Sequence, residues 1–277
     1  MTGPAPAPRK AERKLADLGL RTISAAVMGA VSLAALAWGG WPFAILLSAA
    51  AFAMVWELRR MRAPRFDALG WIVALGAAGA CIITELSFMR WGMLWLALAL
   101  APLAILWARG KAGPVTLVGG LYIAAACAAF VGLRDDDHYG FEAALWVIIT
   151  VMAADIGGYF GGRLIGGAKL WPAVSPGKTW SGFLAGIGFA AAVGAVFAAA
   201  TTGTFAHEVA IVSAAIAVVS VGGDLAESRL KRVCGVKDSS NLIPGHGGVL
   251  DRMDGMLAAA LLASLISFAR GQSVFIW

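Results

Sequence analysis

Residues 182–201 read GFLAGIGFAAAVGAVFAAAT, a run without a single charged side chain. A helix of about 20 apolar residues is long enough to cross the hydrocarbon core of a bilayer. Glycine and alanine dominate the run, and in lipid such small residues let two helices approach each other closely. The run therefore predicts a transmembrane helix that packs tightly against a neighbour.

Similar apolar runs occupy most of the 277-residue chain, which is 60% hydrophobic and only 14% charged. About a quarter of the residues of a soluble domain carry a charge, so this composition indicates a polytopic membrane protein. We expect an all-α fold whose transmembrane helices number about nine. They are predicted over residues 22–39, 41–57, 70–88, 91–108, 115–133, 141–161, 182–201, 206–222 and 254–270.

The first span follows a polar, basic N-terminal segment, residues 1–21. No convincing cleavage site follows this segment, so we expect the first span to be retained. We interpret residues 22–277 as a single membrane domain. Its two longest connections on one side of the membrane, residues 162–181 and 223–253, are predicted to be the catalytic loops.

The basic residues are distributed unevenly across the predicted membrane. With the N-terminus in the cytoplasm, nineteen of the 22 basic residues fall on the cytoplasmic side, and only Arg90, Arg134 and Arg270 fall on the other. Such a bias is typical of inner-membrane topology. The net charge of +6 fits loops held against anionic lipid headgroups. No basic face is interleaved with aromatic residues, which argues against nucleic acid as a partner. The three scattered cysteines argue against a disulfide framework or a zinc site.

The most polar stretch, residues 223–255, reads GDLAESRLKRVCGVKDSSNLIPGHGGVLDRMDG. Its carboxylates include Asp224 at the end of one predicted span, and Asp251 and Asp254 at the start of the next. Two antiparallel helices would bring these side chains together at the membrane face. Oxygen ligands beside phosphates suit Mg²⁺, so we predict Asp224 and Asp251 as metal ligands. The alternative is that these aspartates only cap helix ends.

Basic side chains and a histidine are interleaved with these acids. They could neutralise the charge of a phosphate as it moves during transfer, although a simple cytoplasmic excess of positive charge would also place basic residues here. His246 lies between glycines whose backbone N–H groups can approach an anion, and it could donate to a phosphate or transfer a proton. The basic residues of this set are Lys231, Arg232, Lys237 and Arg252.

A second polar region begins inside the sixth predicted span with Asp155, a candidate for function because ionisable residues are costly there. The run SPGKTW follows at residues 175–180. It is not a P-loop, because Pro172 stands where that motif needs glycine and no strand is expected before it. We nevertheless expect Ser175, Lys178 and Thr179 to contact phosphate.

Taken together, these residues resemble the signature of the phosphatidate cytidylyltransferases, also called CDP-diacylglycerol synthases. Residues 155–159 and the SPGKTW run also look like that family, whereas the similarity is weak over the first five spans. The family usually has Glu after Lys-Thr-Trp, and this chain has Ser181. The signature positions are Ser228, Lys231-Arg232, Lys237-Asp238, His246-Gly247-Gly248, Asp251-Arg252 and Asp254.

The resemblance implies a reaction in which the phosphate of phosphatidic acid attacks CTP. It also implies Mg²⁺, a possible second cation, and a homodimer in the bacterial inner membrane with its active site on the cytoplasmic side. The residues expected to act in catalysis are Asp224, Asp251, Lys231, Arg232, Lys237 and His246. Those expected to bind substrate are Asp155, Ser175, Lys178, Thr179, Ser228, Asp238, Gly247, Gly248, Arg252 and Asp254.

Two other functions remain open from the sequence. A transporter would also be polytopic and could carry an intramembrane aspartate such as Asp155, but the charges cluster at one face instead of lining a path. A CDP-alcohol phosphotransferase would also place aspartates at the membrane face. The pattern expected of that family does not follow Asp254-Gly255.

Overall fold

A computed structural model describes residues 10–63, 65–87, 114–136, 138–202, 207–273 and 275. Within these residues, eight helices are long and apolar enough to cross a membrane, which confirms the predicted all-α polytopic fold. The span predicted over residues 91–108 lies outside the described part of the chain. The helices are α1 (Lys10–Trp38), α2 (Gly40–Arg62), α3 (Ala68–Ser87), α5 (Pro114–Arg134), α6 (Gly140–Leu164), α7 (Trp180–Thr202), α8 (His207–Val233) and α9 (Leu250–Arg270).

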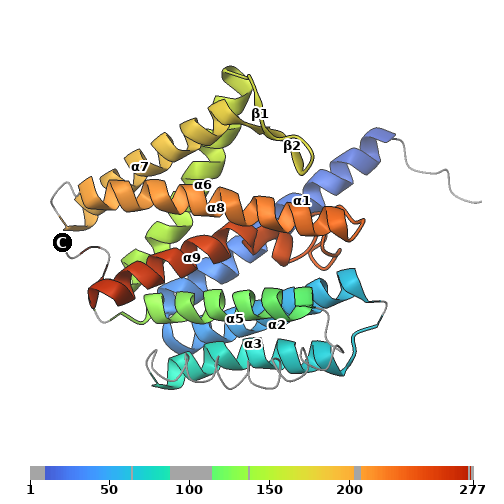
Figure 1. Cartoon of the computed structure of the whole chain (residues 1–277), viewed down its shortest axis with the longest axis horizontal. Helices are drawn as coiled ribbons and strands as arrows, with labels where there is room; N and C mark the ends of the chain where they lie inside the picture. The colour runs from blue at the N-terminus through green and yellow to red at the C-terminus, as the bar shows by residue number, and fades with distance from the viewer. Residues whose placement is uncertain are drawn as a thin grey trace, which may run out of the picture.

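The helices form two packed groups with α9 between them (Figure 1). On one side lie α2, α3 and α5, and on the other lie α6, α7 and α8. A continuous hydrophobic core joins the groups, and its largest fully buried side chains include Trp146, Met54 and Leu257. Because α9 contacts both α5 and α8, residues at its start are fixed relative to both groups.

Among the described helices, α6 and α7 make the most extensive contact, as the small residues of the opening sequence predict. A Cβ atom added to Gly182 would lie 2.5 Å from the carbonyl oxygen of Gly158, and one added to Gly186 would lie 2.6 Å from that of Ala154. Both obstacles are backbone atoms of α6, which cannot rotate away. Only glycine therefore permits this approach.

Two differences from the predicted secondary structure concern the polar regions. Residues 224–233, predicted to lie in a loop, continue α8 for almost three turns, so Asp224 lies within the helix and not at its end. The SPGKT run is itself a strand, β2 (Ser175–Thr179), which pairs antiparallel with β1 (Lys169–Trp171). The expectation that no strand precedes this run is wrong. Such a short hairpin leaves no hydrophobic periodicity in the sequence to announce it.

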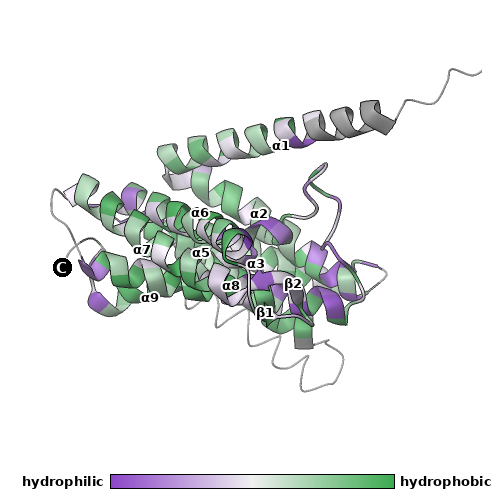
Figure 2. Ribbon diagram, turned by 90° about the horizontal axis from the view of Figure 1, so that it is seen from above, coloured by the Kyte–Doolittle hydropathy of each residue, from purple (hydrophilic) through white to green (hydrophobic). Residues whose placement is uncertain are grey.

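Hydrophilic residues gather at both ends of the helices, and the larger group lies at the end that carries β1 and β2 (Figure 2). The same view shows α1 beside the bundle as a separate layer. Over residues 21–38 its apolar side chains are largely uncovered, with Val27 56% exposed and Trp38 82% exposed. In a membrane protein, such a surface is expected to face lipid.

Candidate active site

The site is centred on the crossing of α8 and α9, where glycines lie next to aspartates. A Cβ atom on Gly223 would lie 2.6 Å from the carbonyl oxygen of Asp254, and one on Gly255 would lie 2.5 Å from the hydroxyl of Ser220. The two backbones can approach this closely only because both residues are glycine. The close approach carries Asp224 and Asp254, the neighbours of these glycines, toward each other.

Three carboxylates meet at this crossing. One oxygen atom each of Asp224, Glu227 and Asp254 lies within 4.8 Å of the others, a spacing that suits a shared cation. Glu227 is 7% exposed, and its Oε1 atom accepts no hydrogen bond within the described residues. Glu227 is not among the site residues predicted from the sequence. The available signal was its position three residues after Asp224, which places both on one face of a helix.

Asp251, predicted as the second metal ligand, makes other contacts. Its Oδ1 atom lies 2.7 Å from Nζ of Lys231. Its Oδ2 atom accepts hydrogen bonds from the backbone N–H and hydroxyl of Ser239, both at 2.9 Å, and from the N–H of Gly248 at 2.8 Å. The carboxylates of Asp224, Glu227 and Asp254 thus form one cluster, and Asp251 is not part of it. The role of Asp251 as a metal ligand stays a prediction.

Lys231 connects the carboxylate cluster to Asp251. Its ammonium group lies 2.6 Å from Glu227 and 2.7 Å from Asp251, and its side chain is only 12% exposed. The salt bridge to Glu227 follows the i, i+4 spacing of α8. A buried lysine between two carboxylates is held in one position, because leaving any of the three charges unpaired would be costly.

The remaining basic residues of the signature lie around this centre. Arg232, Lys237 and Arg252 are exposed, in the last turn of α8, the following loop and the first turn of α9. Asp238 is exposed in the same loop. Ser228 donates a hydrogen bond of 3.1 Å to Asp224, so in this structure it orients a carboxylate of the cluster.

The glycine-rich loop that carries His246 rests against α1. The Nδ1 atom of His246 lies 2.9 Å from the hydroxyl of Ser24, which also lies 3.0 Å from the carbonyl oxygens of Pro244 and Arg21. Two carbonyl oxygens thus compete for the single proton of this hydroxyl. This arrangement favours a histidine that donates from Nδ1 and leaves Nε2 as an acceptor. Gly247, in the same loop, has φ +82°, which a side chain would strain.

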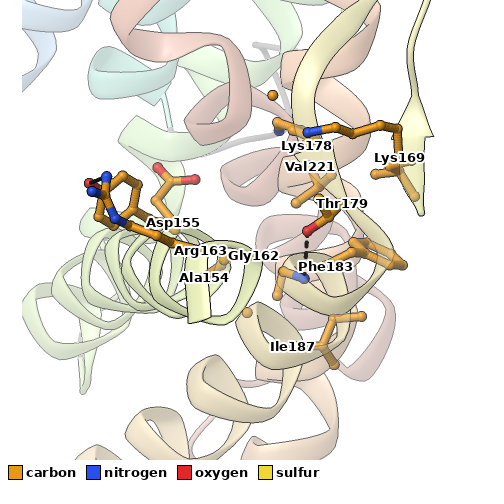
Figure 3. A pocket seen from close by; sticks show the side chains of 17 residues that line it. Ala154, Asp155, Gly162, Arg163, Lys169, Lys178, Thr179, Phe183, Ile187 and Val221 are labelled. Atoms are coloured by element: carbon orange, nitrogen blue, oxygen red, sulfur yellow. Dashed lines mark hydrogen bonds between the residues drawn. The ribbon is translucent and has the colours of Figure 1, made fainter. Parts of the chain in front are cut away.

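A cavity of about 420 Å³ opens between α6, α7, α8 and the hairpin. Figure 3 shows Asp155 of α6 on one wall, with Lys178 and Thr179 of β2 on another. Lys178 also forms a salt bridge with Asp224, so it links the cavity to the carboxylate cluster. The cavity therefore joins the two regions that the sequence analysis singled out.

The hairpin is fixed to the helices by polar contacts. Thr179 precedes α7 and accepts a hydrogen bond of 3.1 Å from the N–H of Gly182, which caps that helix (Figure 3). The Arg229 guanidinium lies 5.6 Å from the ring centre of Trp171, a cation–π contact from α8 to β1. Ser175, at the other end of β2, is half-buried and is not among the residues that line the cavity.

Ser181, which stands where the resembled family usually has Glu, faces the backbone of a loop. Its hydroxyl donates to the carbonyl oxygen of Gly166 and lies 3.1 Å from the hydroxyl of Thr179. In this chain the position therefore supports the turn between α6 and the hairpin.

Comparison with known proteins agrees with this geometry along nearly the whole chain. Residues 19–269 match the model of the cytidylyltransferase family. The chain belongs to this family. It is 37% identical to a phosphatidate cytidylyltransferase of Brucella suis over 91% of this chain and 93% of the relative. It is 30% identical to a protein of the same name from Bacillus subtilis over 88% of this chain and 95% of the relative.

Identity is higher over the half of the chain that a third relative covers. A phosphatidate cytidylyltransferase of Haemophilus influenzae is 46% identical over 138 residues, 48% of each chain. The predicted membership of this family is thus confirmed. None of these relatives is named as a transporter or a CDP-alcohol phosphotransferase.

Proposed function

We propose that this protein is a phosphatidate cytidylyltransferase. A phosphate oxygen of phosphatidic acid attacks the α-phosphorus of CTP, and the bond between that phosphorus and the oxygen that bridges to the β-phosphate breaks. Pyrophosphate leaves, and CDP-diacylglycerol is the product. This activity is the one named for the relatives in Brucella suis and Bacillus subtilis that match along most of the chain.

The observation that carries the proposal is that predicted metal-binding and phosphate-binding residues meet beside the cavity. Asp224 and Asp254 come from two helices, and Lys178 reaches Asp224 from the hairpin. Transfer of a nucleotidyl group requires acidic residues for a metal and basic residues for phosphate at one place. A transporter needs no such arrangement at one end of its helices.

The cation proposed here is Mg²⁺, and the donor set fits it. Mg²⁺ takes oxygen ligands, chiefly carboxylates together with substrate phosphates, and the three carboxylates of Asp224, Glu227 and Asp254 offer such oxygens within 4.8 Å of one another. When bound, the ion neutralises charge on the phosphate oxygens. Asp251 and a second cation remain parts of the proposal. Asp251 would offer its Oδ1 atom, which has Lys231 as its only hydrogen-bond partner among the described residues.

The basic side chains can hold the phosphates of the substrates. Lys178 lines the cavity next to Asp224, so it can bind a phosphate oxygen beside the metal ligands. Arg232, Lys237 and Arg252 are exposed around the same centre and can neutralise the departing pyrophosphate. His246, with Nε2 free to accept, is placed in the loop next to Asp251. Its role in proton transfer is part of the proposal.

The proposed location is the cytoplasmic face of a bacterial inner membrane, where CTP is available. The bias of basic residues toward the end that carries the hairpin supports this orientation. We also propose a homodimer, on the strength of the family resemblance.

The test is a direct assay of the purified full-length protein with labelled CTP and phosphatidic acid, with and without EDTA. Formation of a labelled lipid nucleotide that EDTA abolishes is the expected result. A CDP-alcohol phosphotransferase would instead consume CDP-diacylglycerol, and a transporter would form no labelled lipid. Either of these results would refute the proposed function.

A further inference from the structure

Helix α9, which carries two of the signature aspartates, has no cap of its own. Its N-cap residue is Val249, whose side chain cannot accept a hydrogen bond. The first N–H groups of a helix need acceptors from elsewhere. Here Glu57 of α2 provides them, accepting from the N–H of Val249 at 2.9 Å and of Leu250 at 2.8 Å. A carboxylate 192 residues away in sequence thus caps the helix on which Asp251 lies.

Glu57 is fully buried, with 0% of its surface exposed. Besides the two N–H groups, it accepts hydrogen bonds from the hydroxyls of Ser239 at 3.1 Å and Ser240 at 2.7 Å. A buried carboxylate is tolerated only when its oxygens are well supplied with donors. The four donors come from both ends of the segment 239–250, so Glu57 ties the two ends of this segment together.

Ser239 also connects Glu57 to Asp251. The Ser239 hydroxyl lies 3.1 Å from Oε2 of Glu57 and 2.9 Å from Oδ2 of Asp251. A hydroxyl has one proton, so it donates to one of these carboxylates at a time. The position of Glu57 thereby limits where Ser239, and with it Asp251, can lie.

The loop approaches Glu57 closely at Gly248. A Cβ atom on Gly248 would clash with the Ser239 hydroxyl and lie 2.5 Å from Oε1 of Glu57. The loop carrying His246 therefore approaches Glu57 at a residue without a side chain. This is the same glycine whose N–H donates to Asp251.

We infer that Glu57 is a positioning residue of the active site, which fixes the start of α9 and orients Asp251 through Ser239. It lies outside the signature and touches neither the cavity nor the carboxylate cluster, so it acts through other residues. The inference rests on the proposed function for its kinetic test. The Mn²⁺-binding test does not depend on the proposed function.

The test compares Glu57→Gln with Glu85→Gln in the purified full-length protein. Glutamine keeps the shape of Glu57 but turns one acceptor oxygen into a donor, which opposes one of the two N–H groups, because Val249 and Leu250 donate to different oxygens. Glu85 is the matched control, because its carboxylate also contacts a polar partner, Asp135, but lies on α3 far from α9. Initial rates are normalised to folded protein, measured from the monodisperse fraction in size-exclusion chromatography.

We expect Glu57→Gln to lower kcat by about tenfold to a hundredfold, the range usual for supporting partners of ligands. The KM for CTP should change much less than kcat, and Glu85→Gln should retain wild-type kcat. A purely structural role would reduce the amount of folded protein and leave kcat per folded molecule unchanged. A loss of kcat below about fivefold in folded Glu57→Gln would therefore overturn the inference.

Two further measurements keep the inference decidable. If Glu57→Gln does not fold, Ser239→Ala takes its place under the same threshold, because it removes the hydroxyl that lies between Glu57 and Asp251 and leaves three donors on Glu57. If the wild type forms no CDP-diacylglycerol, the proposed function fails, and MnCl₂ titration followed by electron paramagnetic resonance decides the positioning role. Mn²⁺ binding weakened about tenfold in the variant supports it. Unchanged binding, or no binding by the wild type, overturns it.

Discussion

The two ends of the helix bundle both place carboxylates beside a basic residue, but for different purposes. At the end opposite the hairpin, the Arg134 guanidinium donates to the carbonyl oxygens of Leu36 at 2.7 Å and Ala37 at 3.3 Å. It thereby satisfies the last carbonyl groups of α1, and Asp135 forms a hydrogen bond with Glu85 nearby. Charge at this end completes the backbone of a helix terminus.

At the hairpin end, the charged groups face one another. Asp224, Glu227 and Asp254 converge on a common point, and Lys178 and Lys231 contact them from two sides. Like charges held this close repel each other unless a cation joins them. At the hairpin end three carboxylates from two helices converge beside two lysines, whereas at the opposite end Asp135 meets Glu85 beside Arg134. Substitutions at each end should therefore affect activity very differently.

The largest effect is expected from Asp224→Asn. The change keeps the shape of the side chain and removes a charge from the cluster, which should lower kcat roughly a thousandfold through loss of metal-assisted charge stabilisation. Asp135→Asn removes a carboxylate from the opposite end and should leave kcat near the wild-type value. Activity above about a tenth of wild type in folded Asp224→Asn at saturating Mg²⁺ would exclude Asp224 from the metal site.

Lys178→Met should have the next largest effect. It removes the charge that joins the cavity to Asp224 while preserving most of the side-chain volume, and we expect a loss of kcat/KM of about a hundredfold. Arg65→Ala is the control, because Arg65 is an exposed basic residue in the connection from α2 to α3. Equal losses in both variants would mean that Lys178 contributes only general positive charge. The measurement is the rate of lipid-nucleotide formation over a range of CTP concentrations.

A smaller effect is expected from Ser181→Glu. Ser181 supports a turn through Gly166, so its replacement by the residue usual in the family should alter kcat or Mg²⁺ dependence within about tenfold, near 1.4 kcal/mol. The natural protein is expected to be active as it stands. If it proves inactive with CTP and phosphatidic acid while Ser181→Glu restores turnover, this position carries an essential function that the serine lacks.

The smallest effect concerns stability and belongs to the opposite end. Burial, and then the neighbouring Glu85, raise the pKa of Asp135 from 3.8 to about 7. The folded protein therefore retains a proton that the unfolded chain loses, and stability should fall as pH rises between these two values. The midpoint of thermal unfolding should decrease from pH 5 to pH 7.5, and the decrease should be smaller in Asp135→Asn. An identical pH dependence in both proteins would refute this assignment.

The sequence predicted the helices well because each long apolar run has only one stable form in lipid. It also predicted that the polar segments on one side would hold the chemistry. The predicted end of α8 was wrong. The polar residues 224–233 resemble a loop in composition, but the helix continues through them to Val233. Polar residues at a membrane face can stay helical when each finds a partner, as Lys231 does.

The residues that sequence reasoning missed share one property: their roles depend on distant partners. Glu57 ends a span beside basic residues and looks like any interfacial charge, and only the fold shows that it caps α9. Glu227 could be recognised only if α8 was known to continue past Asp224, and the polar composition of this segment did not indicate a helix. Pattern reading finds residues grouped along the chain, and it misses residues that tertiary contacts bring together.

The contact between His246 and Ser24 has a consequence for how the enzyme is made. These residues are separated by 222 positions, so the ribosome produces α1 long before the His246 loop. Helix α9 must also be inserted before Glu57 finds the N–H groups it caps. A partly synthesised chain therefore has its membrane anchors but lacks an assembled active site, and activity begins only after nearly all helices have entered the bilayer.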